Sequence, residues 1–169
     1  MKETFSDRRD IVKAILEHER NCFAEIFEEY DFNGWNAIDI MLIISNEINK
    51  RFFYVSPSVT IMLAQAFPDI FKPHQEERSN FIFEKIKINI EKGMEQGIYK
   101  KDISSEMIAR MYIAKLNDIH NPQIYPPEGF TFATIFTTLI DDVLKHITNE
   151  EGKKYYKQRK QLYSILNFR

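Results

Sequence analysis

The sequence predicts an all-α fold, a single bundle of about seven helices. Its length of 169 residues suits one domain, since domains average about 150 residues. Glycine and proline are scarce, with 5 and 6 residues, about half their usual share, which argues against a many-turned β-sandwich or barrel. Between them lie long segments whose apolar residues recur with a period near 3.6. Hydrophobic residues make up 44% of the chain, enough for a real core.

The first two expected helices occupy the first third of the chain. Ser6 or Asp7 can cap a helix that runs to about Tyr30, because such side chains accept hydrogen bonds from the free amides of a first turn. The turn-forming sequence at 31–34 ends it. A second helix is expected over 36–55, and its apolar residues occupy more than one face, so we expect it to be largely buried.

Two further helices are expected before Gly97. Proline in the Ser-Pro-Ser sequence at 56–58 disfavours continuation of the previous helix and suits the start of a short one over 58–67. Residues 68–73 begin and end with proline and are interpreted as a connector. The fourth helix, over 74–96, is apolar around much of its circumference, which predicts a central position, and Gly97 is expected to cap its end.

Three more helices are expected in the last third. One spans 105–120, and a loop over 121–130 holds three prolines and a glycine. The next helix, over 131–147, carries an apolar stripe wider than one packing partner can cover. A last helix spans 150–166, and its basic run is interpreted as a solvated face or a contact for an acidic partner.

Charge and targeting signals exclude several functions. Lysine and arginine number 23 against 25 acidic residues, and the net charge of −2 has the wrong sign for a domain that binds nucleic acid directly. The longest uncharged run, 52–68, is too short and too broken by proline for a membrane span. The N-terminus is charged where a signal peptide is apolar, and the single cysteine, Cys22, excludes an intrachain disulfide. We expect a cytoplasmic protein that binds no membrane.

Catalytic and metal-binding motifs are absent from the sequence. His18 and Glu19 begin a zinc-protease motif that Cys22 interrupts, and no histidine follows a glutamate at the spacing of di-iron bundles. The 5 glycines build neither a dinucleotide fingerprint nor a phosphate-binding loop. Asp142 and His146 are spaced to reach one metal ion, but a surface pair explains them as well. We therefore expect no enzyme, no metal and no cofactor.

Large apolar side chains on the second to fifth expected helices, together with one from the sixth, can line a cavity for a small apolar molecule, with Tyr112 or Asn117 as a polar anchor. The candidate ligand-binding residues are Phe52, Phe53, Met62, Phe67, Tyr112, Asn117 and Phe136. The alternative for each is ordinary core packing, which would make the chain a structural module with a self-filled core.

Three segments resemble TetR-family transcriptional regulators. Residues 5–16 read FSDRRDIVKAIL and are similar to the start of the helix that follows the family's DNA-binding domain. Residues 89–113 are similar to a recurring segment of the family's regulatory domain, in which one helix ends, a short turn follows and the next helix begins. The segment that starts at His146 is similar to the start of a C-terminal helix in one subgroup of the family. The matching residues are Phe5, Arg8 or Arg9, Ile11 or Val12, and Ala14 in the first segment and Gly93, Gly97, Asp102 and Ala109 in the second.

The resemblance implies a helical domain, over 1–169, that binds an effector and dimerises. Only four residues precede Phe5, so we expect no DNA-binding domain in this chain; the effector would control DNA binding by a helix-turn-helix domain outside it. Family members usually dimerise through two late helices, here 105–120 and 131–147, which would explain the wide apolar stripe. The implied homodimer interface comprises Ile108, Met111, Ile119, Phe132, Phe136, Leu139, Val143 and Ile147.

Overall fold

The protein is a helical bundle, as the sequence predicts. The computed structural model describes residues 7–52, 57–126 and 128–166, and within them it contains seven helices and no strand. In chain order the helices are α1 (Arg8–Glu29), α2 (Ala37–Phe52), α3 (Pro57–Ala66), α4 (Pro68–Glu95), α5 (Ser105–Asp118), α6 (Phe132–Ile147) and α7 (Glu150–Leu166).

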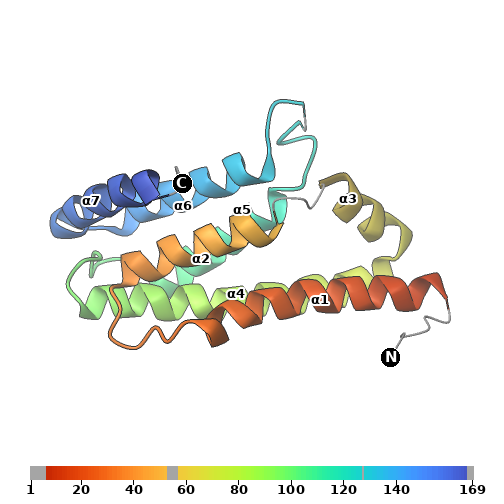
Figure 1. Ribbon diagram of the computed structural model, residues 1–169, viewed down its shortest axis with the longest axis horizontal. Helices are drawn as coiled ribbons and strands as arrows, with labels where there is room; N and C mark the ends of the chain where they lie inside the picture. The colour runs from red at the N-terminus through yellow and green to blue at the C-terminus, as the bar shows by residue number, and fades with distance from the viewer. Residues whose placement is uncertain (1–6, 53–56, 127, 167–169) are drawn as a thin grey trace.

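In Figure 1 the helices α1, α2, α4, α6 and α7 run roughly along the long axis, and the short α3 lies at one end of the bundle. The helix α2 packs against α1, α4, α6 and α7, while α4 packs against α1, α2, α3 and α5. These two helices therefore occupy the centre, which confirms the predictions of a largely buried second helix and a central fourth one. The core follows from this arrangement, because the apolar stripes of six helices meet between α2 and α4.

Side-chain caps fix the starts of three helices. The Asp7 carboxylate accepts hydrogen bonds from the amides of Arg9 and Asp10, so Asp7 is the cap of α1. The Ser104 hydroxyl caps α5 in the same way, and the Thr131 hydroxyl caps α6. Each satisfies a backbone N–H that the helix itself leaves unpaired.

The expected connector over 68–73 is wrong, because α4 begins at Pro68. Proline suits the first position of a helix, where the missing N–H is not needed. Pro73 lies inside the helix, and the residues beside it are buried: Phe71 is 8% exposed and His74 is 2% exposed. Phe71 packs in a small cluster with Leu16 of α1. Burial of this face stabilises a helical path that Pro73 by itself disfavours.

The turn between α4 and α5 is joined to the turn between α6 and α7. Gly97 ends α4 with a φ of 72°, which confirms the expected glycine cap. The amide of Lys100 donates to the carbonyl of Ile147 at 2.8 Å, and the amide of Asn149 donates to the carbonyl of Ile98 at 3.1 Å. The Asn149 side chain adds a bond to the Gly97 carbonyl at 2.7 Å. We call these residues the turn clasp.

The wide apolar stripe of α6 is covered within the single chain. Phe136, Leu139, Val143 and Ile147 are between 0% and 8% exposed, because α2 covers one side of the stripe and α5 the other. These four side chains therefore need no second subunit to cover them, and the homodimer stays a prediction. Ile119, on the turn after α5, is also buried, at 3%.

Only part of the implied dimer interface is accessible. Met111 is 51% exposed, whereas Ile108 and Phe132 are half-buried. A dimer that used the remainder of the implied interface would have to open the core.

Candidate ligand-binding cavity

A cavity of about 490 Å³ lies among α1, α2, α4, α5 and α6. Its volume falls within the roughly 300–1,000 Å³ typical of sites for small molecules. The lining is mainly apolar and rich in aromatic rings, with a few polar side chains. The cavity continues to the loop that joins α1 to α2, where the exposed Asp31 and Asn33 contribute to its wall.

The α4 helix follows the cavity along its length. Arg78, Ile82, Lys85, Asn89 and Lys92 all line it and recur every three or four residues, so they share one face of the helix. At 1.5 Å per residue, the span from Arg78 to Lys92 is about 21 Å. The cavity is therefore elongated, with Arg78 at one end and Lys92 at the other.

Apolar side chains form the middle of the cavity. On α2, Ile40, Ile44 and Ile48 lie four residues apart and face it as one row. From α1, Phe23 stacks on Phe52 of α2, with ring centroids 4.8 Å apart. These side chains offer dispersion contacts and no hydrogen bonds, so this part of the wall suits a hydrocarbon or a ring.

The end at Arg78 contains a half-buried charged network. Arg78 Nη1 donates to Glu19 Oε1 at 2.7 Å, and His74 Nε2 lies 3.5 Å from Glu19 Oε2. Arg20 Nη1 lies 2.9 Å from His74 Nδ1, which must be the acceptor because a guanidinium only donates. Burial raises the pKa of Glu19, but the hydrogen bonds from His74 and Arg78 outweigh it and bring that pKa to about 2.

His120 closes the same end of the cavity. Its ring stacks on Phe132, with centroids 5.7 Å apart and 11° between the planes. It also borders a second, smaller pocket of about 230 Å³ beneath α3. Its Nδ1 is buried and has no hydrogen-bond partner among the described residues. Burial lowers the pKa of His120 and the nearby Arg78 charge lowers it further, which favours the neutral ring.

Tyr112 places a hydroxyl in the middle of the cavity wall. The residue is 3% exposed, and no hydrogen bond to its hydroxyl occurs among the residues that the structure describes. Burial raises the pKa of Tyr112, so the hydroxyl stays protonated. It is therefore available as a hydrogen-bond donor to a bound molecule.

The opposite end is more open, and two lysines line the wall on the way to it. The Lys85 ammonium lies over the rings of Phe27 and Phe81, 4.7 and 5.3 Å from their centroids. Lys92 Nζ donates to the backbone carbonyl of Phe32 at 2.7 Å. This end thus joins the cavity to the surface through charged side chains whose apolar stems extend the wall.

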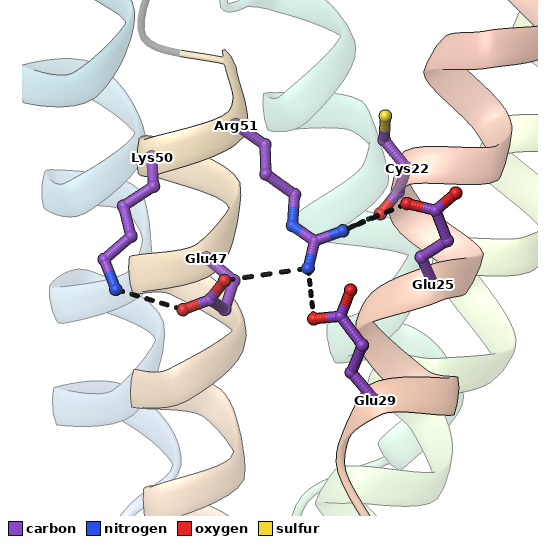
Figure 2. Close-up of polar contacts among 6 residues, drawn as sticks. All are labelled: Cys22, Glu25, Glu29, Glu47, Lys50 and Arg51. Atoms are coloured by element: carbon purple, nitrogen blue, oxygen red, sulfur yellow. Dashed lines mark hydrogen bonds and ion pairs between the residues drawn. The ribbon is translucent and has the colours of Figure 1, made fainter.

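An ion-pair cluster fastens α1 to α2 beside the cavity. Figure 2 shows Arg51 of α2 between Glu25 and Glu29 of α1, with Glu47 of its own helix on the third side. The Arg51 guanidinium lies 2.5 Å from Glu29 and 3.3 Å from Glu25, and Lys50 pairs with Glu47 at 3.2 Å. Only 19% of the Arg51 side chain is exposed, so solvent screens this cluster less than a fully exposed pair.

Three of the predicted ligand-binding residues line the cavity: Phe52, Tyr112 and Phe136. Met62 instead lines the smaller pocket and is 56% exposed. Phe67 packs in the small cluster of α1, α3 and α4.

The two remaining predicted residues are Asn117 and Phe53. The Asn117 side chain accepts a hydrogen bond from the Ser79 hydroxyl at 3.4 Å, away from the cavity wall, and Phe53 falls outside the described residues.

Sequence reasoning missed α1, and although it expected the fourth helix in the wall, it named no residue of α4. Glu19, Phe23 and Phe27 of α1 line the cavity, as does the polar and apolar row that begins at Arg78 on α4. The spacing of that row was a usable signal for a polar cavity wall. Arg78, Lys85 and Lys92 recur at seven-residue intervals on a helix face whose other residues are typical of a core.

Other kinds of site were searched for as well. Groups of three or more metal-ligating side chains do not occur in the described part of the chain. Within the same residues, no helix combines the length and the apolar character needed to cross a bilayer. Comparisons of the chain with family models, with curated proteins and with solved structures find nothing that matches.

Proposed function

We propose that this chain is an effector-binding domain that takes one small, mainly apolar molecule in the cavity. The observation that carries the proposal is a cavity of about 490 Å³ inside a helical bundle, with mainly apolar walls and a few polar groups. A core built only for stability leaves few voids larger than a water molecule. Apolar walls with a few placed polar groups are typical of ligand sites.

The resemblance to TetR-family regulators supports a regulatory role for this binding. In the proposal, the ligand stabilises one arrangement of the helices and thereby controls a separate helix-turn-helix domain that binds DNA. The domain itself performs no chemistry in this proposal. Its function is to convert occupancy of the cavity into a change of helix positions.

A structural dimerisation module is the second candidate. Met107 and Met111 favour it, because they are 58% and 51% exposed and lie four residues apart on α5, where they form an apolar strip. This candidate leaves the cavity without a role. A dimer through α5 is also compatible with ligand binding, so the two candidates differ in whether the cavity takes a ligand.

Binding of N-phenyl-1-naphthylamine, a neutral apolar dye that fluoresces in apolar surroundings, tests the proposal. We expect saturable binding with one dye per chain, and loss of that binding in Ile82→Trp, which fills the middle of the cavity. Leu162→Trp is the control, because it adds the same ring at a position that is 48% exposed on α7. Native mass spectrometry of the protein as purified then reports subunit number and any retained organic mass.

The outcomes separate the two candidates. Saturable binding that Ile82→Trp removes and Leu162→Trp retains supports a ligand-binding cavity. A dimer that binds no dye and carries no adduct favours the structural module and contradicts the proposal.

A further inference from the structure

We infer that the ligand carries a neutral hydroxyl or carbonyl group on an aromatic ring, that this group hydrogen-bonds to His120 at the closed end of the cavity, and that a carboxylate there is excluded. The inference rests on the proposed function, since it names the class of molecule that the same cavity takes. Three features of the closed end lead to it: its charge balance, its unused hydrogen-bonding capacity and its stacked rings.

The charges at the closed end are already paired. Glu19 pairs with Arg78 at 2.7 Å, and Arg20 pairs with Glu77 at 3.1 Å, so two cations meet two anions. The Arg78 side chain is only 10% exposed. A ligand carboxylate at this end would lose its water and find no free cation, which makes its burial unfavourable.

His120 lines the cavity, and its ring nitrogens form no hydrogen bond with the described residues. Its buried Nδ1 has no partner within the described residues, and buried polar atoms without partners are rare in proteins. A neutral imidazole has one donor nitrogen and one acceptor nitrogen. The ring can therefore bond a hydroxyl, which both donates and accepts, or a carbonyl, which accepts.

Stacked rings form the wall beside this group. His120 stacks on Phe132, and Phe132 stacks on Phe136 with centroids 5.4 Å apart and 9° between the planes. Such a wall favours a flat ring, because aromatic faces pack well in offset stacks. The expected ligand is thus a ring that bears the neutral polar group, followed by an apolar extension along the elongated cavity.

Three matched compounds test this assignment by calorimetric titration. They are 4-hexylphenol, hexylbenzene, which lacks the hydroxyl, and 4-hexylbenzoate, which replaces it with a carboxylate. We expect 4-hexylphenol to bind about three- to tenfold more tightly than hexylbenzene, the gain of one neutral hydrogen bond. We expect 4-hexylbenzoate to bind at least about tenfold more weakly than 4-hexylphenol.

Two variants locate the hydrogen bond. In His120→Phe the stack on Phe132 is kept but the nitrogens are lost, so the affinity for 4-hexylphenol should fall to that for hexylbenzene. Tyr112→Phe tests the rival assignment, because it removes the hydroxyl that is the other unpartnered polar group of the wall; if His120 holds the ligand, the preference should remain. Thermal unfolding of both variants establishes that they fold.

Each result has one interpretation. Equal affinities of the unaltered protein for 4-hexylphenol and hexylbenzene overturn the inference and leave the proposed function standing. A preference that survives in His120→Phe, or one that disappears in Tyr112→Phe, overturns the assignment to His120. Tight binding of 4-hexylbenzoate overturns the neutral-group requirement. Failure of all three compounds to bind overturns the inference and the proposed function together.

Discussion

Replacement of Asp39 by alanine should loosen α7 from the bundle. Asp39 lies in the first turn of α2, is 7% exposed, and accepts hydrogen bonds from the Tyr155 hydroxyl at 2.5 Å and from Arg159 Nε at 2.6 Å. Both donors belong to α7. The Asp39→Ala variant leaves the Arg159 guanidinium, with 35% of its side chain exposed, without its carboxylate.

The size of the effect follows from the burial of the two bonds. Hydrogen bonds to charged groups contribute about 1.5–3 kcal/mol each, and the exposure of Arg159 reduces its part. We therefore expect the free energy of unfolding to fall by about 2–4 kcal/mol. In a chain of this length that corresponds to a melting temperature lower by about 5–12 °C.

Thermal unfolding followed by circular dichroism measures this difference. Asp142→Ala is the matched control, because Asp142 forms an ion pair with Lys115 at 3.1 Å in which the side chains are 65% and 50% exposed. Such a pair contributes about 0–1 kcal/mol, so its loss should shift the melting temperature by less than about 3 °C. An Asp39→Ala protein that melts with the control would refute the argument that this carboxylate holds α7.

Three further predictions concern the core and the closed end. Phe136→Asp places a charge at a position that is 1% exposed, so we expect loss of the helical circular dichroism signal. If the variant still folds, the side chain at position 136 lies at a surface and the described core is wrong there. Gly93→Ala puts a methyl group 2.0 Å from the Tyr99 ring and should destabilise by about 1–3 kcal/mol in urea unfolding, whereas Gly129→Ala, with its nearest atom at 3.9 Å, should not. The pKa of Glu19 lies at about 2, below its ordinary 4.5, so its ionised form stabilises the fold fully above pH 4.5 and progressively less as the pH falls toward 2. Urea unfolding of the unaltered protein and of Glu19→Gln should differ most at pH 7 and converge in acid, and a gap independent of pH would contradict the assignment.

Most of the helical pattern could be predicted from the sequence, because amphipathic periodicity reports directly which residues face a core. The exceptions have physical causes. Pro68 and Pro73 together indicate a connector. Pro68, however, is compatible with the first turn of a helix, and burial of Phe71 stabilises the helix in which Pro73 lies. The wide stripe of α6 indicates two packing partners, but periodicity does not say whether they belong to one chain or two.

The candidate site was less predictable than the fold. Ile40, Ile44 and Ile48 have the spacing of ordinary core residues, and the same spacing lines the cavity. A void arises from the distance between helices, which depends on all the side chains at their contacts and leaves no mark on one helix's pattern. Polar residues within an apolar face are the better signal, and Arg78 and His120 are the two that now mark the closed end.

The turn clasp has a consequence for the order of folding. Its bonds between Ile98, Lys100, Ile147 and Asn149 join residues about 50 positions apart, so they close a loop that contains α5 and α6. The hairpin of α4 and α5 needs only local contacts and is expected to form earlier, since short-range contacts carry the smaller entropic penalty. A clasp that closes late adds little to the folding rate, and its loss should appear mainly as faster unfolding.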